Sequence, residues 1–343
     1  MGHATRCLPV IRACRNEGAE VIVVGSPSVV KRIRIDFPDI QFVEEELFVP
    51  VYSNLFPAWL KILLQVPMIL KSEHSSYSRL QTLIKAEGID LILSDNRYYV
   101  YSNLCKSILI SHQLNPRTPS FLSVFQWFVK KRVASFCSPF QEVWVPDLDK
   151  ERPLSGELSL NHLLQSKIKF CGFLSRFGVV ESETPEGQYD LLILSGPAPQ
   201  PELLLRKVAS VYSNQTKNQL KVISAVKLSC KEEVVLILNP GDEEFQSLVS
   251  GAQNIICRSG YSTIMDLLAL QRRALLIPTP GQTEQEYLAE HLRGIGFTSV
   301  NQSAVDQFKN PDQLPFPEQM IATNTRAEFE IINAMIAYQL NRT

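Results

Sequence analysis

Short apolar segments alternate with helical segments along the whole chain, and this alternation limits the possible folds more than any other feature. In the first half, apolar strands are expected at 20–25, 40–45, 89–95, 107–113 and 142–147. Apolar residues recur at helical spacing in 7–18 and 73–88, so helices are expected there. Strands joined through helices form a parallel sheet that is covered on both faces. The pattern therefore predicts an α/β fold with a doubly wound sheet.

The second half repeats this scheme. Its expected strands are 189–196, 221–225, 232–241, 254–257 and 274–278, and its expected helices are one from about Glu202, then 263–270, 283–292 and 326–340. Residues 175–188 are polar and aperiodic, which is typical of a linker. We therefore expect two Rossmann-like domains facing a cleft, 1–174 and 189–325, with the option that helix 326–340 packs back on the first.

Length and composition exclude several classes of protein. A chain of 343 residues is longer than a single hydrophobic core usually supports, so two domains are expected. A net charge of −1 gives no electrostatic field for nucleic acid. The seven cysteines are scattered and contain no Cys-x-x-Cys pair, which argues against a disulfide frame or a zinc site. We expect a cytoplasmic protein without cofactor or metal.

Residues 47–71 form a strongly apolar stretch and contain aromatic side chains, among them Tyr52, Phe56 and Trp59. Lys61 and three prolines exclude a simple membrane-spanning helix. Two interpretations stay open. The segment is either a buried helix preceded by a loop, or an interfacial segment that holds the protein at the inner face of the membrane, near a lipid-linked acceptor.

The segment CRSGYSTIMDLLAL, residues 257–270, is expected to end a strand and begin a helix through a tight turn. Ser259 or Ser262 is expected to cap the helix, and Gly260 leaves room for a ligand against the backbone. Unpaired N–H groups and the positive end of the helix dipole favour an anion at such a place. An ordinary capped helix is the alternative.

Polar residues follow the expected strands of the first half. Asp95, His112, Gln113 and Asp147 each stand at or just after a strand end, where ligands bind in doubly wound sheets. Asp95 has a structural alternative as a helix cap. The Asp-x-Asp spacing at 147–149 is used by metal-dependent sugar transferases, but a turn explains it better here.

Residues 256–297 resemble the nucleotide-sugar motif of the MurG-like glycosyltransferases, which have the two-domain GT-B fold. The order is Arg-Ser-Gly, hydroxyl residues, an acidic residue one turn later, a Leu-x-x-Pro strand and a helix start containing Gln. MGHATRCLPVIRAC at the start of the chain resembles the end of the family's Gly-x-Gly-His-x-x-Arg loop, and 194–200 resembles its second-domain first loop. The resemblance implies transfer of a sugar, typically a hexosamine, from UDP to a hydroxyl, without a metal ion and with inversion.

The resemblance also implies site residues. The donor side would comprise Ser195, Gly196, Arg258, Ser259, Gly260, Tyr261, Ser262, Thr263, Asp266, Gln282, Thr283, Gln285 and Glu286. Asp266 would bind the ribose, although the family usually has Glu there, and Glu286 departs from the usual Gln-Gln pair. The base would be His3, with Asp95 as its rival, and the acceptor side would comprise Asn96, Arg97, His112 and Gln113.

Three further expectations concern the start of the chain and the reaction. The sequence enters the Gly-rich loop at Met1, so we expect the central strand of the first sheet, and with it part of the natural chain, to lie upstream. A nucleotide-sugar epimerase or hydrolase is the alternative enzyme. A non-catalytic nucleotide-sugar-binding subunit of a membrane complex is the alternative from another class.

Overall fold

The computed structural model describes residues 2–45, 75–118, 124–148, 153–179, 187–212, 218–230, 234–318 and 326–341, with residues 2, 3 and 326 described by their backbone alone. The apolar stretch 47–71 and residues 180–186 of the expected linker lie outside these ranges. The chain forms two compact units: the first comprises 1–174 with 330–343, and the second comprises 175–329. Each unit is an α/β structure, which confirms the predicted fold class.

All strands of the first unit are parallel to their neighbours. They are β1 (Ile22–Gly25), β2 (Gln41–Glu44), β3 (Leu91–Asp95), β4 (Lys106–Ile110), β5 (Glu142–Val145) and β6 (Ile168–Phe170). They form two separate sheets, one ordered β1-β2 and one ordered β3-β4-β5-β6. Because β4 and β5 are covered on both faces, their side chains are almost all buried.

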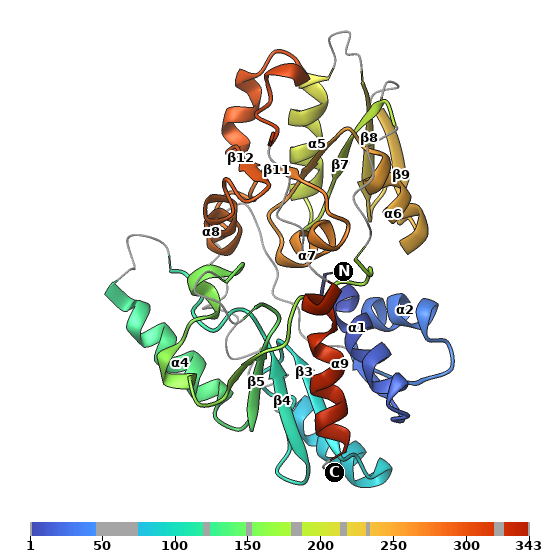
Figure 1. The fold of residues 1–343 in the computed structure, drawn as a ribbon, viewed down its shortest axis with the longest axis vertical. Helices are drawn as coiled ribbons and strands as arrows, with labels where there is room; N and C mark the ends of the chain where they lie inside the picture. The colour runs from blue at the N-terminus through green and yellow to red at the C-terminus, as the bar shows by residue number, and fades with distance from the viewer. Residues whose placement is uncertain are drawn as a thin grey trace. The chain divides into compact units, whose positions relative to one another are not determined.

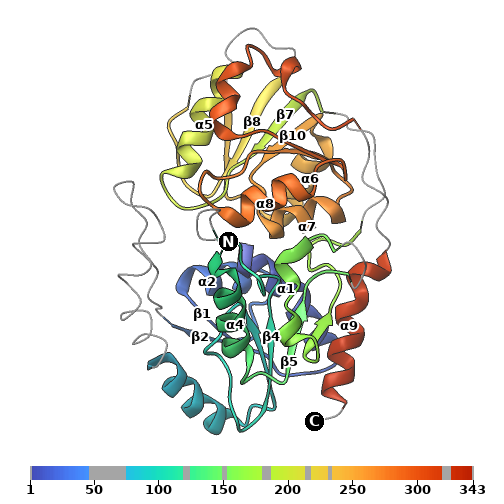
Figure 2. The ribbon, with the colours of Figure 1, turned by 90° about the vertical axis from the view of Figure 1, so that its left-hand side faces the viewer.

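Helices connect and cover these strands. They are α1 (Gly2–Asn16), α2 (Pro27–Asp36), a helix over 75–87, α4 (Gln126–Cys137) and α9 (Arg326–Leu340), with short 3₁₀ turns η2 (Gly156–Ser159) and η3 (His162–Leu164). In α1, Ala4, Leu8 and Ile11 recur at helical spacing and are buried against Ile33 of α2 and Ile40. In Figure 2, α1 and α2 lie beside β1 and β2.

The end of α9 is fixed to the first unit by a buried polar network. Gln339 Nε2 donates to Glu142 Oε2 at 3.2 Å, and Lys106 Nζ donates to Gln339 Oε1 at 2.6 Å. Glu142 also accepts from the indole N–H of Trp144 at 2.8 Å. These contacts place α9 against β4 and β5, as Figure 1 shows. The C-terminal part of α9 therefore belongs to the first unit.

The described part of the second unit contains one parallel sheet of six strands. They are β7 (Tyr189–Ile193), β8 (Gln219–Ser224), β9 (Val234–Leu238), β10 (Asn254–Cys257), β11 (Ala274–Leu276) and β12 (Phe297–Ser299), in the order β12-β11-β10-β7-β8-β9. Its helices are α5 (Gln200–Val211), α6 (Asp242–Gly251), α7 (Tyr261–Ala269) and α8 (Thr283–His291), with 3₁₀ turns η4 (Gln302–Gln307) and η5 (Pro311–Gln313). The strand order reverses between β7 and β10. Ligands bind at such switch points in open α/β sheets.

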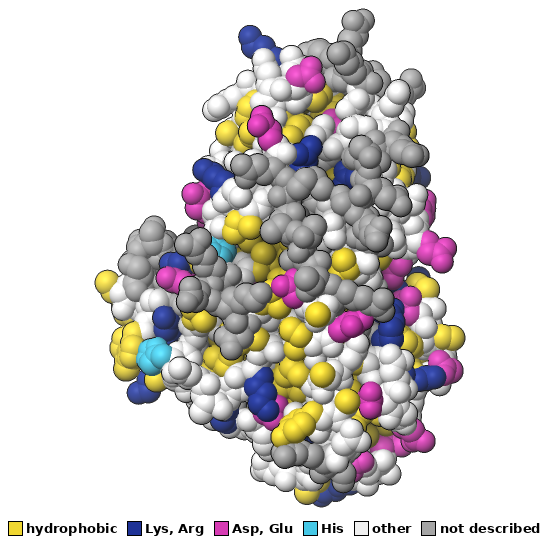
Figure 3. All heavy atoms as spheres, viewed as in Figure 1, with side chains coloured by type: hydrophobic (Ala, Val, Ile, Leu, Met, Phe, Trp, Pro, Cys, Tyr) yellow, Lys and Arg dark blue, Asp and Glu magenta, His cyan; other side chains and the backbone are white. Residues whose placement is uncertain are grey.

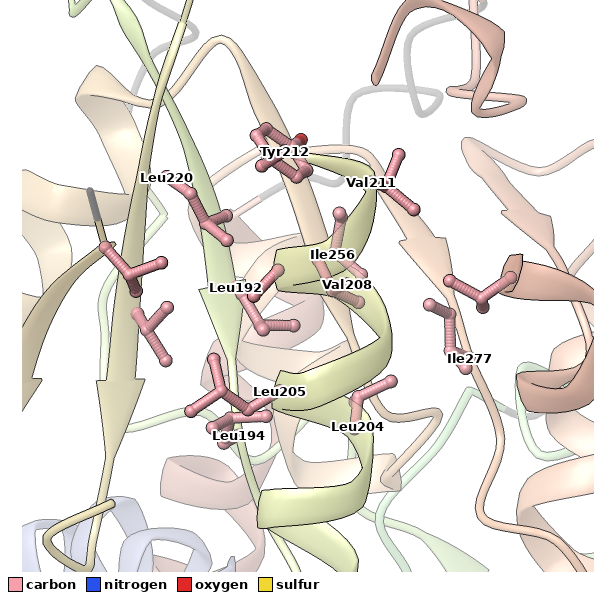
Figure 4. Packing of buried hydrophobic residues seen from close by; sticks show 14 of the residues in the cluster. Leu192, Leu194, Leu204, Leu205, Val208, Val211, Tyr212, Leu220, Ile256 and Ile277 are labelled. Carbon is pink, nitrogen blue, oxygen red and sulfur yellow. The ribbon is translucent and has the colours of Figure 1, made fainter. Parts of the chain in front are cut away.

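The core of the second unit lies between its sheet and α5. Alternate strand residues such as Leu192, Leu220 and Ile256 face Leu205 and Val208 of α5, and all five are nearly inaccessible to solvent (Figure 4). Full burial of one such side chain stabilises the fold by about 1.5–3 kcal/mol. This packing fixes the strand ends from which the loops of the site emerge.

Candidate functional site

Three loops emerge side by side from the sheet of the second unit. They join β7 to α5, β10 to α7 and β11 to α8, and β10 pairs with both β7 and β11. Since all three strands are parallel, their carboxyl ends lie at one edge of the sheet. The helix starts that follow them therefore gather at the switch point.

Helix α7 begins without a side-chain cap. Its N-cap residue is Gly260, with φ −80° and ψ 130°, and no side chain makes a capping hydrogen bond. The helix begins two residues earlier than the sequence predicts, so Ser262 lies in its first turn. The prediction that Ser259 or Ser262 caps the helix is wrong, because Ser259 is buried and its hydroxyl donates to the carbonyl of Gln285 at 2.7 Å.

The first turn of α7 also contains no acidic residue, in contrast to the other helices of this unit. The first turns of the others hold Glu202 in α5, Asp242, Glu243 and Glu244 in α6, and Glu284 and Glu286 in α8. A carboxylate in the first turn offsets the positive end of a helix. Among the helices described in this unit, α7 is therefore the one whose dipole no such side chain offsets.

Arg258 lies directly before this helix and is 1% exposed. Its Nη1 donates to the carbonyls of Ile277 and Pro278 at 3.0 and 3.1 Å, and its Nη2 donates to the carbonyl of Gln200 at 3.2 Å. Arg258 thereby ties the α7 loop to the loops that lead into α5 and α8.

The charge of Arg258 has no carboxylate partner among the described residues, and its Nε has no hydrogen-bond acceptor there. Burial lowers the pKa of Arg258 to about 10, so the side chain stays cationic at neutral pH. An unpaired buried cation is costly unless an anion approaches it. Arg258 and the start of α7 thus both favour a negatively charged ligand.

The polar residues around α8 support the shape of their own loop. Gln285 Oε1 accepts from the backbone N–H of Thr279 at 2.9 Å, and its Nε2 donates to Gln282 Oε1 at 2.6 Å. Glu286 Oε1 accepts from the N–H of Gly281 at 2.9 Å. Their predicted contacts with sugar hydroxyls stay a prediction.

Asp266 lies one turn inside α7 and is buried. Ser175 Oγ donates to its Oδ1 at 2.8 Å, and Arg176 Nε donates to its Oδ2 at 3.1 Å. Arg176 also bonds to Asp242 at 2.7 Å. Burial raises the pKa of Asp266 in spite of Arg176. The carboxylate therefore anchors the first residues of this unit, and its predicted ribose contact stays a prediction.

The remaining donor-side residues lie around the same edge of the sheet. Ser195 and Gly196 are exposed in the loop after β7, and Gly196 has φ +102°, a conformation suited to glycine. Tyr261 is buried in the first turn of α7, whereas Thr263 is partly exposed there. Thr283 is the first residue of α8.

In the first unit, the carboxyl ends of β3 and β4 carry a polar cluster centred on Arg6 of α1. Arg6 Nη2 donates to Asp95 Oδ1 in an ion pair, and Arg6 Nη1 lies 3.2 Å from His112 Nδ1. Arg6 is 3% exposed. The alternative that Asp95 caps a helix is wrong, because a turn follows β3. Arg6 was not among the predicted site residues, although it ends the quoted Gly-His-x-x-Arg motif.

The Arg6 contact determines which nitrogen of His112 carries the proton. A guanidinium has donors and no acceptor, so Nδ1 must accept. The proton of the neutral ring is then on Nε2. His112 therefore presents a hydrogen-bond donor at its other ring nitrogen.

The other acceptor-side predictions lie next to this cluster. Asn96 has φ +53°, its N–H donates to the carbonyl of Ile110 at 2.9 Å, and its Oδ1 accepts from Ser111 Oγ at 2.9 Å. Arg97 Nη1 lies 3.4 Å from Tyr99 Oη. Gln113 donates its N–H to Ser111 Oγ at 3.1 Å. The side chain of His3 lies outside the described part of the structure.

Asp147 is fully buried and serves as a loop anchor. Its carboxylate accepts the backbone N–H groups of Leu148, Leu154 and Ser155 at 2.7 to 3.0 Å. This agrees with a turn at 147–149, although Asp149 lies outside the described residues. Within the described ranges, no group of three or more His, Cys, Asp or Glu could hold a metal ion, and no helix there is long and apolar enough to cross a membrane.

Comparison with known proteins gives the following matches. Residues 193–308 match the glycosyltransferase family 28 C-terminal domain. No curated protein matches the chain.

Solved structures match over nearly the whole chain. The spinosyn rhamnosyltransferase SpnG complexed with thymidine diphosphate has a TM-score of 0.62 at 13% identity, covering 99% of this chain and 94% of that one. The kitacinnamycin glycosyltransferase has 0.59 at 15% identity, covering 99% and 90%. MurG of Acinetobacter baumannii has 0.52 at 14% identity, covering 98% and 91%.

These likenesses confirm the predicted GT-B fold. The family match lies on β7 to η4, the part of the chain that contains Arg258 and the start of α7. The chain is therefore a glycosyltransferase with the GT-B fold, and its residues 193–308 are similar to the glycosyltransferase family 28 C-terminal domain.

Proposed function

We propose that the chain transfers a sugar from a nucleoside diphosphate, with UDP-hexosamine as the first candidate donor, to a hydroxyl of an acceptor. The diphosphate binds at the start of α7, beside Arg258. The observation that carries this proposal is the combination of an uncapped helix start without acidic residues and a buried arginine without a carboxylate partner among the described residues.

Two similar structures support a nucleoside diphosphate as the ligand class. SpnG was solved with thymidine diphosphate. A glycosyltransferase of Arabidopsis thaliana, UGT89C1, was solved with UDP-L-rhamnose, and it matches this chain with a TM-score of 0.56 at 10% identity.

 The match with UGT89C1 covers 98% of this chain and 90% of that chain. Both ligands named for these proteins carry a pyrimidine nucleoside diphosphate, so the assay compares UDP with TDP and uses GDP as the purine control.

The chemistry follows from the charges of the site. As the sugar leaves, negative charge grows on the diphosphate, and the N–H groups of α7 with Arg258 stabilise it in place. In this proposal they supply the charge that a divalent cation supplies in metal-dependent transferases. The acceptor hydroxyl attacks the anomeric carbon from the face opposite the nucleotide, which inverts its configuration. Asp95 or His3 takes the proton, and Asn96, Arg97, His112 and Gln113 bind the acceptor.

Calorimetric titration with UDP, TDP and GDP tests the donor class, and incubation with labelled UDP-sugars tests the reaction. Saturable binding of UDP or TDP supports the proposal, and absence of binding by every nucleotide contradicts it. Transfer that persists in EDTA supports the metal-independent mechanism. A change in the stereochemistry of the donor sugar without any acceptor would indicate an epimerase. Release of free sugar and UDP would indicate a hydrolase, and binding without turnover would indicate a non-catalytic subunit.

A membrane contact is a separate part of the proposal, and it rests on α4. Phe125, Trp127 and Phe128 are each more than half exposed, and hydrophobic side chains gather over α4 at the left edge of Figure 3. Lys131 lies over the Trp127 ring at 5.1 Å. Exposed aromatics next to cations suit the interface of an anionic bilayer.

Sedimentation with vesicles that contain phosphatidylglycerol tests this contact. The double substitution Phe125→Ser and Trp127→Ser should reduce the bound fraction several-fold. Ile35→Ser, at an exposed position of α2 in the same unit, serves as the control and should bind as the unchanged protein does. Equal binding by all three proteins would contradict the assignment to α4.

A further inference from the structure

Arg6 lies at the centre of the polar cluster of the first unit, but its burial keeps it from contacting a substrate. Its side chain is 3% exposed, whereas the side chain of Asp95 keeps 12% of its surface exposed. Arg6 contacts Asp95 through Nη2 and His112 through Nη1, which are the two ends of one guanidinium. Any effect of Arg6 on a reaction must therefore act through its partners.

The two partners of Arg6 come from different strands. Asp95 is the last residue of β3, and His112 follows the last residue of β4 by two positions. In open parallel sheets, ligands bind at the carboxyl ends of the strands. The guanidinium is a planar fork whose donors point in fixed directions. One rigid group therefore orients two polar side chains at the edge of the sheet where an acceptor is expected.

Arg6 also attaches the start of α1 to these strand ends. Helix α1 begins at Gly2, so the backbone of His3 lies in the first turn of the helix that carries Arg6. The apolar cluster that buries α1 joins it to α2 and does not include Arg6. The contacts of Arg6 with β3 and with the loop after β4 are therefore a separate, polar attachment. Both proposed bases, Asp95 and His3, depend on it for their position.

A purely structural role does not account for an arginine at this place. Burial of an ion pair is costly, and well-packed apolar residues often stabilise a fold equally well or better. The backbone of the two strand ends is held by other contacts. The N–H of Asn96 donates to the carbonyl of Ile110 at 2.9 Å, and the N–H of Ser111 donates to the carbonyl of Trp144 at 2.9 Å. What Arg6 adds is the orientation of two side chains.

We propose that Arg6 is a positioning residue for sugar transfer, because its guanidinium holds Asp95 and His112 in one arrangement and fixes the start of the helix that carries His3. Since these residues form the acceptor side only if the chain has the proposed function, the role of Arg6 rests on that function. Loss of Arg6 should misplace the base whether it is Asp95 or His3. A displacement of about 1 Å can reduce a reaction rate about 100-fold.

Two substitutions separate the charge of Arg6 from its geometry. Arg6→Met removes the charge and keeps an unbranched side chain. Arg6→Lys keeps the charge, but an ammonium group lacks the planar fork that holds two partners in fixed directions. Arg15→Met is the matched control on the same helix, because Arg15 also pairs with an aspartate, Asp39, at 2.6 Å, but their side chains are 40% and 60% exposed.

The first measurement needs neither donor nor acceptor. Long-range ¹H–¹⁵N NMR spectra at about pH 8, where an ordinary histidine is neutral, show which ring nitrogen carries the proton. His112→Gln assigns the signals. We expect one form, protonated on Nε2, in the unchanged protein and in Arg15→Met, because a guanidinium can only donate to Nδ1. Arg6→Met should show a mixture of both neutral forms, and a single Nε2-protonated form in that variant would overturn the proposal.

The second measurement is transfer of labelled sugar from UDP-N-acetylglucosamine to n-octyl β-D-glucopyranoside, a model acceptor with free hydroxyls. Arg6→Met should lower kcat about 100-fold and leave the KM for the donor and the Kd for UDP within about twofold, since the proposed donor site lies in the second unit. Arg6→Lys should recover only a small part of this loss, and Arg15→Met should transfer sugar as fast as the unchanged protein. Full activity of either Arg6 variant would overturn the proposal, and circular dichroism checks that each variant is folded.

Failure of this inference differs from failure of the proposed function. If the unchanged protein binds no nucleotide, the proposed function is contradicted, and the role of Arg6 in sugar transfer is contradicted with it. If the unchanged protein binds UDP and transfers sugar, and Arg6→Met does so equally fast, the proposed function stands and the role of Arg6 is wrong. If it binds UDP but does not use this acceptor, the proton position on His112 decides the role of Arg6.

Discussion

Replacement of Gly260 by alanine tests the proposed diphosphate site most directly, because the protein itself tolerates the change. A Cβ at Gly260 would meet one neighbouring atom, Thr263 Oγ1, at 3.9 Å, which is an ordinary contact. The φ of −80° is also allowed for alanine. Alanine is a weaker N-cap than glycine, so we expect unfolding of the second unit to become easier by about 1 kcal/mol or less.

The effect on the ligand should be much larger. A phosphate that contacts the N–H groups of α7 must pass close to Cα of Gly260, and a methyl group there would push it away. Loss of one hydrogen bond to a charged group costs about 1.5–3 kcal/mol. Because about 1.4 kcal/mol corresponds to a factor of ten, the Kd for UDP should rise roughly 10- to 100-fold.

Gly241→Ala provides the matched control. Gly241 is the N-cap of α6, has φ −62° and has no atom within 4 Å of an added Cβ. The helix that follows begins with three acidic residues, which disfavour an anion. Calorimetry should therefore give an unchanged Kd for Gly241→Ala. An unchanged Kd for a folded Gly260→Ala variant would refute the site, since the added methyl group should displace a phosphate bound there.

Three further predictions concern other parts of the molecule. Arg258→Lys should abolish measurable UDP binding and lower the free energy of unfolding by about 2–4 kcal/mol, because lysine cannot reach the three carbonyls that Arg258 joins; retained binding in titration calorimetry would contradict this. Asp95→Asn should leave the Kd for UDP unchanged and reduce the transfer rate by about 100-fold or more if Asp95 is the base, whereas an unchanged rate of sugar transfer would leave that role to His3. Burial alone would raise the pKa of Glu142, but hydrogen bonds from Trp144, Lys169 and Lys106 outweigh it and lower the pKa to about 2 from an ordinary 4.5. Glu142 therefore stabilises the fold above pH 4.5 and loses this contribution as the pH falls toward 2, so the difference in urea stability between the unchanged protein and Glu142→Gln should shrink over that range, and a difference independent of pH would contradict the network.

The elements that the sequence predicts well are those whose signal is local. The strand at 254–257 and the last helix, 326–340, have the predicted bounds, because an apolar run or helical spacing extends over each of them. Strands β6 and β12 have three residues each, too few for a periodic signal, and neither was predicted. The start of α7 was misplaced by two residues, because Ser259 has its partner at Gln285, 26 positions away.

The polar cluster of the first unit also depends on contacts between residues that are far apart in the sequence. Asp95 and His112 were predicted from their places at strand ends, a local signal. Arg6, which joins them, is 89 residues from Asp95 and 106 from His112, so spacing alone could not reveal the contact. The Gly-His-x-x-Arg motif at the start of the chain includes Arg6, but the motif does not indicate which residues the arginine contacts.

The Arg6 contact also limits how this cluster can move a proton. Protonation of His112 at Nδ1 would place two donors against each other, and the contact with Arg6 would be lost. While the contact holds, His112 can donate through Nε2 but cannot act as the base through either nitrogen. The ion pair with Arg6 holds the Asp95 carboxylate in place, where it can accept a hydrogen bond from a hydroxyl. The cluster is thus suited to orient an acceptor hydroxyl, and the transfer rate of the Asp95→Asn variant decides between Asp95 and His3 as the base.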